Sequence, residues 1–257
     1  MTIEPRRSLG QHFLVDENVL GVIGRLSRLH AADVVVEVGP GLGVLTRYLS
    51  DRVRVVHSIE VDRSLERTLR ENLAGRPNVR LIWDDALRVD LGTLRPRPTK
   101  LVANLPYNIA TPLVVETLEH ARSLVHWCVM VQREVADRLF AEPRTKAYGA
   151  VSVLVQLSAR KTGFHAVSPT VFRPRPRVES ALVAFEREEV AAIADVRGVV
   201  EAAFAHRRKT AANALAHSGL ATRDAAGEAL AAIGRPPTAR AEELRPEEFV
   251  RLADALR

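Results

Sequence analysis

The chain has 257 residues, of which 47% are hydrophobic, and it carries a formal net charge of +6 at pH 7. A chain of this length and hydrophobic fraction can form one large core and a small second domain. None of its apolar stretches approaches the roughly 18 residues of a membrane-spanning helix. A single cysteine, Cys128, excludes an internal disulfide, and residues 1–30 show no secretory signal, so we expect a protein of the reducing cytoplasm.

Apolar runs and helical patterns alternate from residue 34 to residue 141. Strands are predicted over residues 34–38, 53–59, 79–82, 100–103 and 126–132, and helices over 44–50, 62–73 and 133–141, with another helix opening at Thr111-Pro112. Such alternation is typical of a parallel sheet covered by helices on both faces.

The pattern changes in the second half of the chain. A helix is predicted over residues 148–158 and two more strands over 161–167 and 178–186, separated by a loop whose prolines restrict it to extended conformations. From residue 190 the sequence is alanine-rich and helical. We therefore predict an α/β domain with seven strands over residues 1–187 and a small all-helical domain over residues 188–257.

The positive charge is unevenly distributed. Residues 1–186 hold 26 Lys/Arg against 20 Asp/Glu, whereas residues 187–257 hold 11 of each. Basic clusters occur at Arg6-Arg7, Arg160-Lys161, Arg173/Arg175/Arg177 and Arg207-Arg208-Lys209. Because cationic side chains release counterions from a polyanion, these clusters favour a phosphate-tracking surface. A general bias toward arginine, which outnumbers lysine 33 to 4, is the competing explanation.

A glycine-rich turn, Gly39-Pro40-Gly41-Leu42-Gly43, joins the first predicted strand to a helix. Such a turn lets a nucleotide-like cofactor approach the backbone, at the edge where open α/β sheets bind ligands. A dinucleotide-binding fingerprint would need its third glycine at position 44, which is Val44. The missing glycine weakens the case for a pyrophosphate seated on the helix N-terminus.

Carboxylates follow the next two strands. Glu60 ends the second strand, where it can accept hydrogen bonds from both ribose hydroxyls in nicotinamide or S-adenosylmethionine enzymes alike. Asp85 follows the third strand and can accept from an adenine amine, and Asp84 competes for that role. No histidine has the spacing of a metal ligand, so we predict no metal site.

The tetrapeptide Asn104-Leu105-Pro106-Tyr107 ends the fourth strand and can grip a planar base with an exocyclic amine. The lone pair of the adenine N6 amine is delocalised into the ring, and aligned carbonyl acceptors free it for attack. Asn104 can supply one acceptor and a backbone carbonyl near Leu105 or Pro106 another, while Tyr107 stacks on the base. Together with the glycine turn, these residues predict group transfer from an adenosyl cofactor to a base amine, driven by positioning.

A base must leave its helix or loop to reach such a site. We expect Phe172, in the proline-restricted loop, to close on its other face, with Arg173, Arg175 and Arg177 on flanking phosphates. The alternative is that Phe172 belongs to the core and that the arginines are merely solvated.

These motifs resemble those of the ribosomal RNA adenine N6-dimethyltransferases, and most closely the bacterial small-subunit, kasugamycin-resistance type. The resemblance covers nearly the whole chain. In the first domain it rests on Leu-Gly-Gln-His-Phe-Leu at 9–14, Glu-Val-Gly-Pro-Gly-Leu-Gly at 37–43, Asn-Leu-Pro-Tyr at 104–107, Gln-Arg-Glu-Val at 132–135 and Phe-Arg-Pro-Arg-Pro-Arg-Val-Glu-Ser at 172–180. In the second it rests on residues 204–210, 213–215 and 240–244.

The resemblance implies a Rossmann-like methyltransferase sheet, mostly parallel, that binds S-adenosylmethionine. It implies cofactor contacts from the glycine turn and the strand ends, namely His12, Leu14, Gly39, Gly41, Glu60, Asp85 and Asn104. It also implies that two adjacent adenosines in the 3′-terminal hairpin loop of 16S rRNA, within an immature 30S subunit, each receive two methyl groups. The helical domain would then dock the subunit through Arg207 and Arg208, and nothing demands a dimer. His12 departs from the asparagine that the family often has, and we expect it to tune cofactor affinity.

Three other functions compete with this interpretation. A 23S rRNA adenine N6-methyltransferase conferring macrolide resistance has the same fold, but such relatives usually carry isoleucine at the position of Leu105. A non-catalytic assembly or transcription factor that binds nucleic acid would not need an intact Asn104–Tyr107 segment. A nicotinamide dehydrogenase is disfavoured by Val44 and by the lack of an evident hydride-transfer acid.

Overall fold

The computed structural model describes residues 12–188, 191, 193–206 and 208–257. The chain divides into two compact units. The first comprises residues 1–136 and 161–187, and the second residues 137–160 and 188–257. In the part of the chain that the structure describes, none of the helices is both long and apolar enough to cross a membrane.

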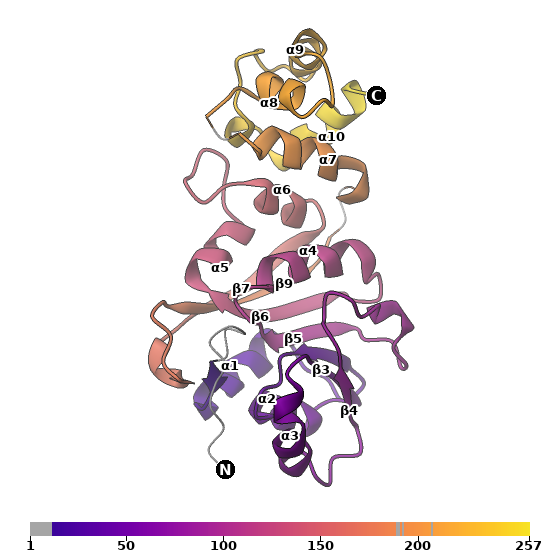
Figure 1. Cartoon of the computed structure of the whole chain (residues 1–257), viewed down its shortest axis with the longest axis vertical. Coiled ribbons are helices and arrows are strands. Elements are labelled where there is room, and N and C mark those ends of the chain that lie inside the picture. Colours follow the sequence, from indigo (N-terminus) through magenta and orange to yellow (C-terminus); the bar gives the residue numbers. More distant parts are fainter. Residues whose placement is uncertain (1–11, 189–190, 192, 207) are drawn as a thin grey trace. The chain divides into compact units, whose positions relative to one another are not determined.

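The first unit is built around a seven-stranded sheet (Figure 1). Its strands lie in the order β4-β3-β2-β5-β6-β9-β7. Its strands are β2 (Val34–Val38), β3 (Val55–Glu60), β4 (Val79–Trp83), β5 (Lys100–Asn104), β6 (His126–Gln132), β7 (Ala159–Val167) and β9 (Ser180–Arg187). The first five pair in parallel, and β9 is antiparallel to β6. The predicted mostly parallel sheet is confirmed. The carboxyl ends of β2 to β6 consequently lie along one edge.

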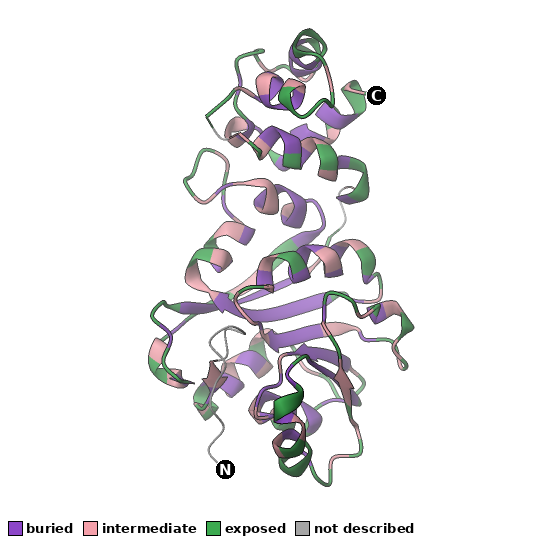
Figure 2. Cartoon of the chain, viewed as in Figure 1, coloured by how far each residue is buried: buried purple, intermediate pink, exposed green. Residues whose placement is uncertain are grey.

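Helices cover both faces of this sheet, with α4 (Ala110–His120) on one side and α1 (Glu17–Leu26) and α2 (Val44–Ser50) on the other (Figure 1). Further elements of the first unit are α3 (Glu66–Asn72), the start of α5 (Arg133–Leu139), and the 3-10 turns η2 (Arg63–Leu65), η3 (Leu91–Thr93) and η4 (Pro169–Val171). Figure 2 shows the strands buried and the outer helix faces exposed. This is the pattern expected of a sheet that is buried on both faces.

Two features of the first unit were not predicted. One is α1, which begins at the N-cap Asp16, whose side chain accepts hydrogen bonds from the Asn18 and Val19 amides. The other is a small sheet in which β1 (Phe13–Leu14) pairs antiparallel with β8 (Phe172–Arg173). Two-residue strands carry no periodicity, so only their pairing across the fold reveals them.

The second unit is helical. It contains α6 (Ala150–Gln156), α7 (Ile193–Phe204), α8 (Ala211–His217), α9 (Arg223–Ala232), α10 (Pro246–Ala255) and the 3-10 turn η5 (Ala241–Glu243). Tyr148 lies before α6 and donates its buried hydroxyl to the Leu244 carbonyl at 2.8 Å, while its ring packs edge-on against Phe204. These contacts explain why residues 137–160, expected in the first domain, group with the C-terminal helices instead.

Candidate active site

A cavity of about 220 Å³ lies at the carboxyl ends of the parallel strands in the first unit. Loops at the ends of four neighbouring strands line it, together with β1. The lining residues are His12, Phe13, Leu14, Glu37, Val38, Gly39, Pro40, Gly41, Leu42, Val44, Leu45, Ile59, Glu60, Val61, Asp84, Asp85, Ala86, Asn104, Leu105, Pro106, Tyr107, Asn108 and Ile109. Every predicted cofactor-binding residue and the whole predicted catalytic tetrapeptide are therefore brought together in one place.

The glycine turn forms one wall of this cavity, and its backbone conformation favours glycine. Gly39 has φ +71° and Gly41 has φ +57°, a left-handed conformation that L-residues with a side chain rarely adopt. At Gly41 a Cβ atom would also lie only 2.7 Å from the ring of Phe13. The turn is thus shaped both by its backbone and by the close approach of β1.

Glu60 is buried at the end of β3, and its carboxylate is anchored by backbone amides. Oε2 accepts from Gly41 at 3.3 Å and Oε1 from Asp62 at 2.8 Å. Burial nevertheless raises the pKa of Glu60 above its ordinary value, although the two amides oppose this. A carboxylate held in this way presents fixed acceptors to a ligand in the cavity.

Glu37, which the sequence analysis did not select, is a second buried acid in the lining. Its Oε2 accepts hydrogen bonds from Thr46 Oγ1 at 2.7 Å and Ser58 Oγ at 2.5 Å. Burial raises its pKa to about 7 against these two hydrogen bonds. A lone carboxyl in the apolar strand Val34–Val38, just before the glycine turn, was the available signal.

Asp84 and Asp85, the two candidates for accepting a hydrogen bond from an adenine amine, both line the cavity. Asp84 is exposed and accepts from the Asp85 amide at 2.7 Å, while Asp85 is half-buried and accepts from the Leu87 amide at 3.0 Å. Arg88, 3.8 Å from Asp85, is an exposed neighbour outside the lining. Among the described residues that line the cavity there are four carboxylates and no lysine or arginine.

Asn104 ends β5 with its amide oriented by β1. Its Nδ2 donates to the His12 carbonyl at 3.0 Å, which leaves Oδ1 as the side-chain acceptor. The Pro106 carbonyl accepts from the Ile109 amide at 3.1 Å, and the Leu105 amide donates to the Met130 carbonyl at 3.0 Å. Of the two backbone carbonyls considered, that of Leu105 is therefore the better second acceptor.

Tyr107 presents a half-buried ring whose hydroxyl lies 2.7 Å from Ser180 Oγ. Burial raises the pKa of Tyr107, so the phenol stays protonated at neutral pH. The His12 ring lies 5.5 Å away, tilted by 31°, and its Nδ1 contacts the Pro174 carbonyl at 2.8 Å. The sequence analysis assigned no role to Ser180, because its partner is 73 residues away in the chain.

Of the predicted substrate-binding residues that the structure describes, only Tyr107 lines the cavity. Phe172 was expected to face the base, but it is fully buried in the core with Leu14, Ile23 and Met130. Its pairing through β1–β8 turns it inward, so the expected role of Phe172 is wrong in this structure. Arg173 and Arg175 are exposed and do not line the cavity. In the second unit Arg208 is exposed, while Arg207 lies outside the described residues.

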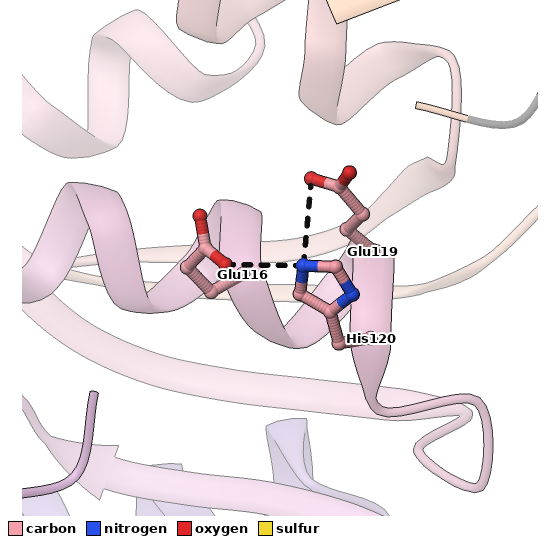
Figure 3. Close-up of side chains that lie close together, drawn as sticks. All are labelled: Glu116, Glu119 and His120. Atoms are coloured by element: carbon pink, nitrogen blue, oxygen red, sulfur yellow. Dashed lines mark ion pairs between the residues drawn. The ribbon is translucent and has the colours of Figure 1, made fainter. Parts of the chain in front are cut away.

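One group of possible metal ligands occurs among the described residues, on α4 (Figure 3). His120 Nε2 lies 3.3 Å from Glu116 Oε2 and 4.0 Å from Glu119 Oε2. The three side chains engage one another as neighbours on a helix surface and lie outside the cavity lining. We assign no ion to them.

Comparison with known proteins decides the family. The profile of the family described as ribosomal RNA adenine dimethylase matches residues 3–257. The chain belongs to this family. A Rubrobacter xylanophilus protein named ribosomal RNA small subunit methyltransferase A is 49% identical over 98% of this chain and 95% of its own length. A Kineococcus radiotolerans protein of the same name is 45% identical over 98% of this chain and 86% of its own.

Solved structures agree with the fold of this rRNA adenine dimethylase family member. The 23S rRNA methyltransferase ErmE has a TM-score of 0.68 and 30% identity, covering 95% of this chain and 99% of its own. A dimethyladenosine transferase from Plasmodium falciparum has a TM-score of 0.79, covering 94% of this chain and 96% of its own, at 22% identity. The second similarity supports the fold alone.

Proposed function

We propose that the chain transfers methyl groups from S-adenosylmethionine to N6 of two adjacent adenosines in the 3′-terminal hairpin loop of 16S rRNA. The products are N6,N6-dimethyladenosines, formed late in small-subunit biogenesis. Small-subunit relatives at 45–49% identity support this substrate over 23S rRNA, since the 23S enzyme is 30% identical. The observation that carries the chemistry is the orientation of Asn104, whose Oδ1 is left as an acceptor beside a carboxylate-lined cavity.

The residues of the cavity fit S-adenosylmethionine. The cofactor supplies a methyl group activated by a positive sulfonium, and the lining offers four carboxylates without a cation. The four acidic side chains would repel a pyrophosphate, and Val44 stands where the dinucleotide fingerprint needs its third glycine, so a dinucleotide is disfavoured. We assign the ribose hydroxyls to Glu60 and the adenine amine to the half-buried Asp85, with His12, Leu14, Gly39 and Gly41 completing the contacts.

The acceptors of the Asn104–Tyr107 segment would activate the target amine. Asn104 Oδ1 and the Leu105 carbonyl would accept hydrogen bonds from the N–H groups of the amine and draw the nitrogen toward a tetrahedral geometry. The Tyr107 ring stacks on the base, with its tilt set by Ser180 and His12. No general base is needed, because the amine sheds its proton after the methyl group has transferred. Positioning therefore supplies most of the rate.

We assign docking on the immature 30S subunit to the helical domain and to the exposed arginines. Arg208 and Arg207 would contact rRNA phosphates from residues 188–257, and Arg173 and Arg175 would hold phosphates near the target. The enzyme would act as a monomer in the cytoplasm, where the subunit is assembled.

Incubation with labelled S-adenosylmethionine and unmethylated small subunits, followed by mapping of the modified nucleotides, tests the proposal. We expect two adjacent dimethyladenosines near the 3′ end of 16S rRNA. Asn104→Ala should abolish transfer while leaving rRNA binding largely intact, and the exposed Asn18→Ala should behave as wild type. Label in 23S rRNA instead, or full turnover by Asn104→Ala, would contradict it.

A further inference from the structure

An exposed aromatic residue lies on the edge strand of the sheet, outside the cavity. Phe164 on β7 is 39% exposed, although a phenylalanine within a strand is ordinarily buried. Its neighbour Gly163 points toward α1, where a Cβ atom would lie 2.6 Å from Leu26. Side chains alternate along a strand, so Phe164 projects from the opposite face. That face is the one from which α5 begins.

Arg133, the first residue of α5, lies over this ring. Its guanidinium carbon is 4.9 Å from the Phe164 ring centroid. The backbone of Arg133 is held by its amide, which donates to the Glu179 carbonyl at 2.9 Å. A guanidinium over an aromatic ring offers the flat, positively charged surface on which a nucleic-acid base stacks.

This pair is connected to the active site through one strand pairing. Ser180, which holds the Tyr107 hydroxyl, is paired with Gln132, the residue before Arg133. The path from Tyr107 to Phe164 thus passes through Ser180, Gln132 and Arg133, all in the first unit.

The surrounding charge suits a polyanion. Residues 161–179 contain four Lys/Arg and one acidic residue. Lys161, Arg173, Arg175 and Arg177 are all exposed. An apolar protein partner or a second copy of the chain would not need this excess of cations, whereas an RNA strand requires it.

We propose that Phe164 and Arg133 form a stacking platform for an unpaired RNA base beside the target adenosine. The inference rests on the proposed function. A base held there keeps its neighbour extruded in the cavity, so the platform binds RNA and positions the loop without touching the reacting atoms. Base–aromatic stacking of this kind corresponds to about 5- to 150-fold in affinity.

Steady-state methylation of unmethylated small subunits by Phe164 variants tests the platform. Phe164→Leu keeps the apolar contact but removes the ring, so we expect KM for subunits to rise by at least about fivefold with kcat unchanged. Phe164→Trp should retain the wild-type KM. Val125→Ala is the control, because Val125 is 52% exposed in the same unit and lies just before the amino end of β6, whereas the cavity lies at the carboxyl ends of the parallel strands.

Salt dependence separates stacking from charge. Phe164→Leu should weaken binding of a target-loop oligoribonucleotide without changing the slope of log K against log salt, whereas Arg175→Ala should reduce that slope by about 0.7 to 0.9. A wild-type KM in Phe164→Leu, or an equal loss in Phe164→Trp, overturns the platform. If the wild-type enzyme labels no adenosine, the proposed function itself fails.

Discussion

The hydrogen bond between Tyr107 and Ser180 can be tested by a double-mutant cycle. Ser180 is fully buried, and its Oγ lies 2.7 Å from the half-buried Tyr107 hydroxyl. A neutral hydrogen bond contributes about 1 kcal/mol net, but a buried hydroxyl left without a partner costs about 1–3 kcal/mol. The variants are Ser180→Ala, Tyr107→Phe and the pair together.

We expect Tyr107→Phe to destabilise the protein more than Ser180→Ala, by about 1–3 kcal/mol, because it leaves the Ser180 hydroxyl inside the core. In Ser180→Ala the Tyr107 hydroxyl can turn toward the cavity, so the cost is about 1 kcal/mol. The double variant should lose less unfolding free energy than the two single variants lose together, because neither hydroxyl is left without a partner.

Urea unfolding measures these free energies, provided that the m-value is unchanged across the series. Methylation kinetics of the same four proteins report the second role of the contact, since a ring no longer held by Ser180 stacks less well. We expect kcat/KM to fall by about tenfold in Ser180→Ala. Strictly additive unfolding energies, or full activity in Ser180→Ala, would show that this hydrogen bond does not position the ring.

Three further predictions concern the cavity and the docking surface. Gly41→Ala should lower stability and cofactor affinity more than Gly75→Ala. Both glycines have positive φ, but a Cβ atom would clash with Phe13 at Gly41 and would meet nothing at Gly75. Calorimetry measures the unfolding and the cofactor affinity of both variants. Burial raises the pKa of Glu37 from 4.5 to about 7, so it contributes stability that is fully present below about pH 4.5 and lost as pH rises through 7. Glu37→Gln should flatten that loss, on the order of 3 kcal/mol, in urea titrations from pH 4 to 8.5. Arg208→Glu should weaken small-subunit binding at low salt without changing cofactor affinity, and unaltered binding would remove Arg208 from the contact.

Much of the fold could be predicted because its signals are local. The apolar runs of β2 and β6 and the start of α2 after the glycine turn follow from periodicity and turn chemistry over a few residues. In a parallel sheet the strands end along one edge, so residues as distant as Gly39, Glu60 and Asn104 were expected to meet, and they share one cavity. The family was also recognisable from these motifs alone.

Contacts between distant segments decided the rest. Whether Phe172 faces a ligand or the core depends on its pairing with Leu14, 158 residues earlier. The free oxygen of Asn104 depends on the His12 carbonyl, and the orientation of Tyr107 depends on Ser180. The exposure of Phe164 likewise follows from its place on an edge strand. Composition and periodicity describe what a segment forms, but the packing partner determines which way each side chain points.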